Sequence, residues 1–168
     1  MKNSLYILFI ISITNFSNSQ EICLKIDSIE CYRIPWNLKS NFNIYKDEII
    51  LEESFSKWRV KNVITNKQAL HFFIEANFMD TSKVLRINKS YSDIDARALL
   101  ILNYNNGLKD TIIFNGNSSY HYGHIVYLSN VKLLLWLIQY NPLPDPNREF
   151  IKPEDVNKLR QEYNFMMK

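Results

Sequence analysis

The pattern of hydrophobic and polar positions is clearest between residues 96 and 115, where it predicts two antiparallel strands. Ala96–Tyr104 is dense in Leu and Ile and stops at Asn105-Asn106-Gly107, and Lys109–Asn115 is a second apolar run. An Asn-Gly pair between two such runs favours a type I′ turn, because both residues tolerate a positive φ. The pattern therefore predicts a β-hairpin.

The meander continues into a hydrophobic helix. Ser118–Ser129 contains Gly123, so it predicts two short strands that fold back at Tyr122-Gly123. Val131–Tyr140 is too apolar for a surface loop; Asn130 suits its N-cap and Pro142 ends it.

Two further helices are predicted. Thr65 and Gln68 have the spacing of a capping box, which opens a helix over Asn66–Phe78 with one apolar stripe. Pro153 suits the first turn of a C-terminal helix, and Glu154 and Asp155 after it complement the helix dipole.

The other segments are less regular. Ile26–Trp36 alternates well enough for a strand that Pro35 ends, and Trp58–Ile64 predicts a shorter one. Asn37–Phe55 fits either a helix or a strand. Met79–Asp95 is polar without a period and is predicted to be the longest loop, either a binding loop or a plain surface excursion.

Together these elements predict the α+β class. We expect an antiparallel sheet of five or six strands, with the helices Asn66–Phe78 and Val131–Tyr140 packed on one face and a C-terminal helix in addition. The expected organisation is a leader over residues 1–19, one α+β domain over 20–140, and a Pro-rich connector with the C-terminal helix over 141–168.

The first residues predict export. A basic start at Lys2 precedes the apolar run Ser4–Thr14, and small residues at Ser17 and Ser19 suit a cleavage site before Gln20. The apolar run is shorter than the roughly 20 residues that span a bilayer, although an uncleaved anchor is the alternative. We expect a mature chain in the periplasm or outside the cell, without stable membrane insertion.

Composition narrows the function classes. The chain has 168 residues with a net charge of +3, and its 46% hydrophobic content is ordinary for one globular domain. So small a charge argues against a nucleic-acid partner, which needs clustered Lys and Arg. Three glycines are too few for Gly-rich phosphate loops.

The two cysteines leave alternatives open. An exported protein meets an oxidising compartment, in which Cys23 and Cys31 could pair. A continuous strand would separate them by about 26 Å, whereas a disulfide needs Cα atoms within about 7 Å. Two free thiols are one reading, and a bridge made by folding back at Asp27-Ser28 is the other.

No catalytic set is apparent. The chain has no G-x-S-x-G elbow, and Cys31 lacks a neighbouring base. His121 and His124 could meet only across a sharp turn, and a metal would need a third ligand such as Asp110. We therefore predict no catalytic residue, no cofactor and no metal.

Aromatic residues supply the candidate binding residues. They crowd a hairpin that we expect at the sheet edge, where exposed Tyr would suit recognition. The alternative is that alternate members pack into the core. The candidate residues are Tyr120, His121, Tyr122, His124 and Tyr127.

One resemblance supports the layout. The run Ile29–Trp36 (IECYRIPW), together with Asp95-Ala96-Arg97, resembles a loose group of small exported bacterial α+β proteins of unknown function. It covers about residues 25–140. The resemblance implies a leader, an early strand, a helix, a meander and a closing helix, and it implies no activity.

The expected function is an exported, non-enzymatic binding or interaction domain, with a protein as the possible partner. An immunity or inhibitor protein of the periplasm, acting against a toxin or a hydrolase, is the alternative. A metal-dependent hydrolase that uses His121 and His124 is the third reading. Ligand and oligomeric state do not follow from the residues.

Overall fold

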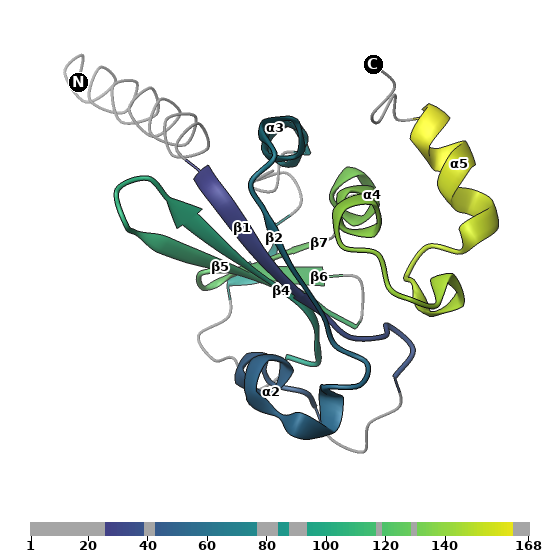
Figure 1. Ribbon diagram of the computed structural model, residues 1–168, viewed down its shortest axis with the longest axis horizontal. Coiled ribbons are helices and arrows are strands. Elements are labelled where there is room, and N and C mark those ends of the chain that lie inside the picture. The colour runs from purple at the N-terminus through teal and green to yellow at the C-terminus, as the bar shows by residue number, and fades with distance from the viewer. Residues whose placement is uncertain are drawn as a thin grey trace, which may run out of the picture.

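The computed structural model describes residues 26–38, 43–76, 84–87, 94–116, 119–128 and 131–162. The predicted leader, Cys23 and most of Met79–Asp95 lie outside these residues. The described residues form a single antiparallel sheet of seven strands in the order β2-β1-β4-β5-β6-β7-β3 (Figure 1). The strands are β1 (Ile26–Arg33), β2 (Val60–Ile64), β3 (Val84–Ile87), β4 (Ala96–Tyr104), β5 (Lys109–Asn115), β6 (Ser119–Tyr122) and β7 (Ile125–Leu128). The α+β class is confirmed.

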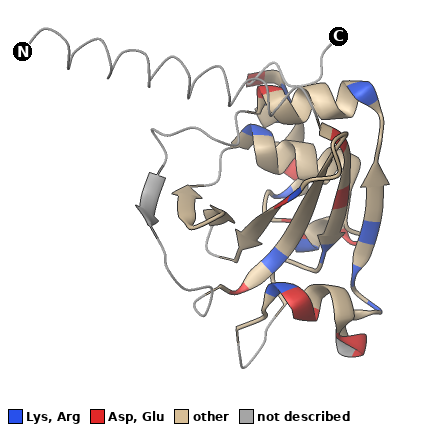
Figure 2. Ribbon diagram, turned by 90° about the vertical axis from the view of Figure 1, so that its left-hand side faces the viewer, with Lys and Arg blue, Asp and Glu red and all other residues tan. Residues whose placement is uncertain are grey.

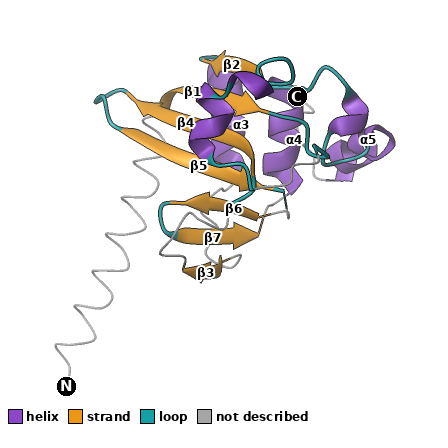
Figure 3. Cartoon of the chain, turned by 90° about the horizontal axis from the view of Figure 1, so that it is seen from below, coloured by secondary structure: helices purple, strands orange, loops and turns teal. Residues whose placement is uncertain are grey.

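Strand β3 is the one that the sequence pattern did not predict. It lies within Met79–Asp95, so the expectation of a loop is wrong at this point. Four residues are too few to show the two-residue period of a strand. Because β3 pairs with β7, the hairpin β6–β7 lies inside the sheet and not at its edge, which corrects a second expectation (Figure 3).

The helices cover both faces of the sheet. Helices α3 (Lys67–Glu75) and α4 (Val131–Tyr140) pack on the same face, as predicted, and α5 (Pro153–Glu162) is the expected C-terminal helix. Helix α2 (Lys46–Leu51) lies on the opposite face (Figure 1). It resolves the ambiguous segment Asn37–Phe55 and is followed by a 3-10 turn at Glu53–Phe55.

The N-cap of α3 differs from the prediction by one residue. Asn66, not Thr65, precedes the helix, and its side-chain oxygen accepts from the N–H groups of Gln68 and Ala69 at 2.9 and 3.2 Å. Asn accepts such bonds as readily as Thr, so the sequence does not decide which of the two neighbouring residues is the N-cap. Residues 77 and 78 of the predicted helix lie outside the described residues.

The turn between β4 and β5 is in the predicted place but is of another type. The N–H of Gly107 donates to the Tyr104 carbonyl at 3.0 Å, and Gly107 has a φ of +82°. The Tyr104 N–H donates to the Leu108 carbonyl at 3.0 Å, which makes a three-residue loop ending in a left-handed glycine. The expected type I′ turn is therefore replaced by a turn with a bulge.

Strand β4 supplies side chains to both cores. Leu100 and Leu102 face α3 and α4, whereas Leu99 faces α2 together with Ile113 of β5. All four are buried. A central strand that is covered on both faces reads as a continuous apolar run, which is why its sequence shows no alternation.

The segment that follows α4 belongs to the folded domain. Asn141, Leu143 and Ile151 are buried, and the Trp36 N–H donates to the Arg148 carbonyl at 3.0 Å. We call residues 141–151 the C-terminal strap. The predicted domain boundary after residue 140 has no counterpart in the packing, whereas α5 has no fully buried residue.

Candidate functional site

The structure separates the five predicted binding residues. Tyr120, His121 and Tyr127 are only 1%, 2% and 3% exposed, so the core-packing alternative describes them. The rings of Tyr120 and Tyr127 stack at 5.2 Å between centroids. Tyr122 is half-buried, and His124 is exposed in the turn beside Gly123. These five residues do not form one exposed patch, because successive strand residues face opposite sides of the sheet.

The two histidines lie in different surroundings. His121 is opposite Ile113 and Val126, on the face of the sheet that α2 packs against. His124 lies in the turn between β6 and β7. The part of the chain that the structure describes contains no group of three His, Cys, Asp or Glu side chains that could hold a metal.

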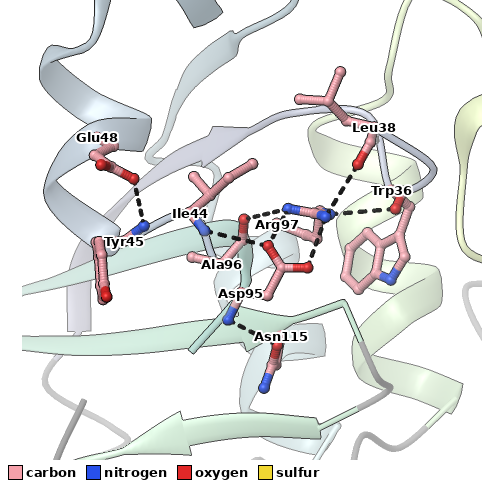
Figure 4. Close-up of polar contacts among 9 residues, drawn as sticks. All are labelled: Trp36, Leu38, Ile44, Tyr45, Glu48, Asp95, Ala96, Arg97 and Asn115. Carbon is pink, nitrogen blue, oxygen red and sulfur yellow. Dashed lines mark hydrogen bonds and ion pairs between the residues drawn. The ribbon is translucent and has the colours of Figure 1, made fainter. Parts of the chain in front are cut away.

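The densest polar cluster surrounds Arg97, where β4 begins (Figure 4). Its Nε donates to the Trp36 carbonyl at 3.3 Å, and its Nη2 donates to the Leu38 carbonyl at 3.1 Å. Both terminal nitrogens donate to the Asp95 carboxylate at 2.7 Å, and Nη1 also donates to the Ala96 carbonyl at 3.2 Å. A guanidinium has five N–H donors, so Arg97 has a protein acceptor for each. The cluster is therefore a structural clamp, in which every N–H group of Arg97 is used within the protein.

Asp95 extends this clamp to two other parts of the chain. Its Oδ1 accepts from the Ile44 N–H at 3.3 Å, and its N–H donates to Asn115 Oδ1 at 3.1 Å (Figure 4). A Cβ at Gly116 would lie 3.1 Å from Asp95 Oδ2. The clamp thereby joins the approach to α2 with the start of β4 and the end of β5. An Arg near the start of a largely apolar strand was the signal in the sequence that could have indicated this clamp.

A second buried arginine holds the C-terminal strap. Arg33 Nη1 donates to the carbonyls of Leu137 and Asn141 at 3.1 and 2.6 Å, and Nη2 pairs with Glu149. The other carboxylate oxygen of Glu149 accepts from the Leu143 N–H at 2.8 Å. Arg33 is 1% exposed. A buried charge of this kind persists only where it is paired and hydrogen-bonded, so the strap and β1 depend on each other.

Cys31 lies beside this pair and is a free, buried thiol. Asn141 Nδ2 lies 3.0 Å from its sulfur, within donating distance. Burial raises the pKa of Cys31 to about 12, although the nearby Arg33 and Asn141 act in the opposite direction. A thiol with so high a pKa is protonated at neutral pH and is a poor nucleophile. Cys23 lies outside the described residues.

One row of facing residues reaches solvent on the sheet face that α2 also packs against. Val63, Glu30, Ile101 and Thr111 lie directly opposite one another across β2, β1, β4 and β5. Val63 is 51% exposed, and the other three are half-buried. We call these four residues the open row.

Polar side chains flank the open row. Asn103 Nδ2 donates to Ser28 Oγ and to Glu30 Oε1 at 3.2 and 3.3 Å, and Lys109 Nζ lies 3.9 Å from Glu30 Oε1. On the other side Lys61 covers the ring of Tyr32, with Nζ 5.1 Å from the ring centroid. Apolar positions thus lie between polar groups that reach solvent.

A smaller polar cluster lies on the opposite face. Tyr104 and Tyr122 both donate their hydroxyl protons to Asp110 Oδ2, at 3.0 and 2.9 Å. Tyr104 is buried, whereas Asp110 and Tyr122 are half-buried. Of the five predicted binding residues, Tyr122 belongs to this cluster.

Comparison with known proteins gives no relative: no family model, curated protein or solved structure matches the chain. The resemblance to small exported proteins stays a prediction. None of the helices in the described residues has the length and apolar character that crossing a bilayer requires.

Proposed function

We propose that this chain is an exported, non-enzymatic interaction domain that binds a protein partner through the open row. The observation that carries the proposal is the exposed Val63, in one row with the half-buried Ile101, on the sheet face that α2 also packs against. Apolar side chains with a polar surround are the usual composition of a protein–protein contact.

The charge distribution supports a protein partner. Lys61 and Lys109 lie on either side of Glu30, so the surface carries both signs. In the view of Figure 2, basic and acidic residues are interspersed over the described elements. A mixed surface of this kind does not favour a polyanion such as a nucleic acid. Export rests on the predicted leader.

The test is capture of a partner by three forms of the chain from Gln20. The forms are wild type, Val63→Asp, and the matched control Leu51→Asp, which alters a 77% exposed side chain on α2. Proteins of the exporting cell are passed over each, and retained proteins are identified by mass spectrometry. One protein retained by wild type and Leu51→Asp, and lost with Val63→Asp, is the expected result. Equal retention by all three forms, or by none, would contradict the proposal.

The nature of the captured protein then separates this reading from the immunity alternative. A toxin or hydrolase that loses activity in a stoichiometric complex on a sizing column would identify the chain as an inhibitor. A partner without such an activity would support the more general proposal of an interaction domain.

A further inference from the structure

Asp110 is distinguished by having no positive partner among the residues that the structure describes. Among the described carboxylates that are buried or half-buried, Glu30, Asp95 and Glu149 each pair with a Lys or Arg. Glu48 receives the Tyr45 N–H at 2.7 Å at the start of α2. Within the described residues no Lys, Arg or His forms an ion pair with Asp110, whose partners are two neutral hydroxyl groups on one of its oxygens.

The surroundings of Asp110 keep its negative charge effective. The buried Tyr104 has a pKa well above its ordinary value, mainly through burial and further through Tyr122 and Asp110. A proton is therefore held on the phenol, which continues to donate to the carboxylate. Oδ2 is occupied by these two donors, and Oδ1 has no protein donor among the described residues. A half-buried carboxylate with one oxygen uncommitted attracts a cation that donates hydrogen bonds.

The register places an apolar surface beside this carboxylate. Tyr122 lies opposite Ile112 of β5 and Ile125 of β7, on the face that also bears Asp110. Ile125 and Tyr122 are half-buried. β6 ends at Tyr122, so its described pairing with β5 stops before the level of Asp110. Tyr122 contacts the carboxylate through its hydroxyl, and Ile125 lies beyond Tyr122 on the same face. An aromatic ring beside a carboxylate, with an aliphatic side chain beyond the ring, suits a cation that carries a hydrocarbon chain.

We propose that Asp110, Tyr122 and Ile125 form a binding site for an alkylammonium group. The ammonium donates to Asp110 Oδ1, and its methylene groups lie against Tyr122 and Ile125. The hydroxyls of Tyr104 and Tyr122 hold the carboxylate in place. A lysine side chain of a partner and a free aliphatic amine share this chemistry. The site is on the face opposite the open row, so it is independent of the proposed interaction surface.

The test is a titration of the chain from Gln20 with n-butylamine at neutral pH, followed by NMR of tyrosine-labelled protein. n-Butanol, which has the same chain without the charge, is the ligand control. Asp110→Asn retains an acceptor for the two hydroxyls and removes the charge. Asp145→Asn is the matched protein control, because Asp145 is an exposed carboxylate that pairs with Arg148. A thermal melt checks that each variant is folded.

Saturable shifts of the Tyr122 resonances with n-butylamine, in wild type and Asp145→Asn, are expected. Asp110→Asn should bind about tenfold more weakly or worse, because a neutral amide lacks the charge that strengthens a hydrogen bond from an ammonium group. Equal shifts with n-butanol, or an unchanged affinity of Asp110→Asn, would overturn the proposal. If Asp110→Asn does not fold, Tyr122→Ala removes the aromatic contact while Asp110 stays. Binding is then followed by the Tyr104 resonances, since the Tyr104 hydroxyl also donates to Asp110, and undiminished affinity would overturn the proposal too.

A second ligand distinguishes the two sources of the group. A short lysine-containing peptide that binds at least tenfold more tightly than n-butylamine would indicate a partner's lysine. Equal or weaker binding of the peptide would indicate a small amine.

Discussion

At the scale of single residues, the polar side chains of this protein differ in how much hydrogen-bonding capacity they have left. Arg97 has an acceptor for every donor, and Arg33 is enclosed by two carbonyls and Glu149. Asp110 has donors on one oxygen only among the described residues. The buried arginines therefore serve the fold, and the half-buried carboxylate is the group available to a ligand.

Replacing Arg97 tests the clamp. Arg97→Lys keeps the charge, but an ammonium has three donors and cannot reach the carbonyls of Trp36 and Leu38 together with Asp95. We expect a loss of about 2–4 kcal/mol in the free energy of unfolding, because buried acceptors are left without donors. Urea unfolding measures it. The matched control Arg148→Lys alters an exposed ion pair and should cost under about 0.5 kcal/mol; equal losses would rule out the clamp.

At the scale of elements, sequence pattern succeeded where an element is long or sharply bounded. Strands β4 and β5 and helix α4 have the predicted bounds, because turn residues and Pro142 end their apolar runs. The same reasoning missed β3, misplaced the cap of α3 by one residue and left α2 undecided. α2 has six residues, too few for a helical period to be read.

Shortening the chain tests the role of the C-terminal strap. A chain that ends after Tyr140 loses the Asn141 carbonyl and Glu149, which leaves Arg33 as an uncompensated buried charge. We expect a loss of about 3–5 kcal/mol, or no cooperative unfolding transition at all. The matched control ends after Lys152 and removes α5, which has no fully buried residue. Its transition, followed by circular dichroism, should persist; if the two chains are equally stable, the strap is dispensable.

At the scale of the whole molecule, the core on the face of α3 and α4 buries, wholly or in part, several acidic groups that stay protonated in the folded state. Burial raises the pKa of Cys31 and of Tyr104, Tyr127 and Tyr140. For each group the folded pKa lies above the unfolded one. The stability that each contributes is therefore complete below the unfolded pKa and is lost as pH rises toward the folded pKa.

Alkaline pH should accordingly weaken the fold from about pH 9 upward. For Cys31, an unfolded pKa of 9.0 and a folded pKa of about 12 imply a loss on the order of 1 kcal/mol between pH 7 and pH 10. Cys31→Ala should remove that share of the loss and leave the share due to the tyrosines. Urea unfolding midpoints of wild type and Cys31→Ala at pH 7 and pH 10 measure this loss. Any destabilisation by the substitution itself that is equal at both pH values cancels in the comparison. An unchanged loss in Cys31→Ala would contradict the assignment.

The candidate site around Asp110 could be predicted from the sequence only to a small extent. The sequence indicated aromatic residues near the hairpin β6–β7, and Tyr122 is among them, but it did not connect Tyr122 with Asp110 or Tyr104. Those three side chains come from β4, β5 and β6 and meet through strand register. Register depends on pairing across the sheet, which no single segment contains.

The sequence by itself determined the α+β class, the main meander with its following helix, and the C-terminal helix, because local periodicity and turn residues act within a few residues of each other. Tertiary structure alone decided the edge strand β3, the helix on the second face, the burial of Tyr120, His121 and Tyr127, and the inclusion of the strap in the domain. These features depend on contacts between distant segments. Their free energy comes from burial and from pairing of charges such as Arg33 with Glu149, which lie far apart in the chain.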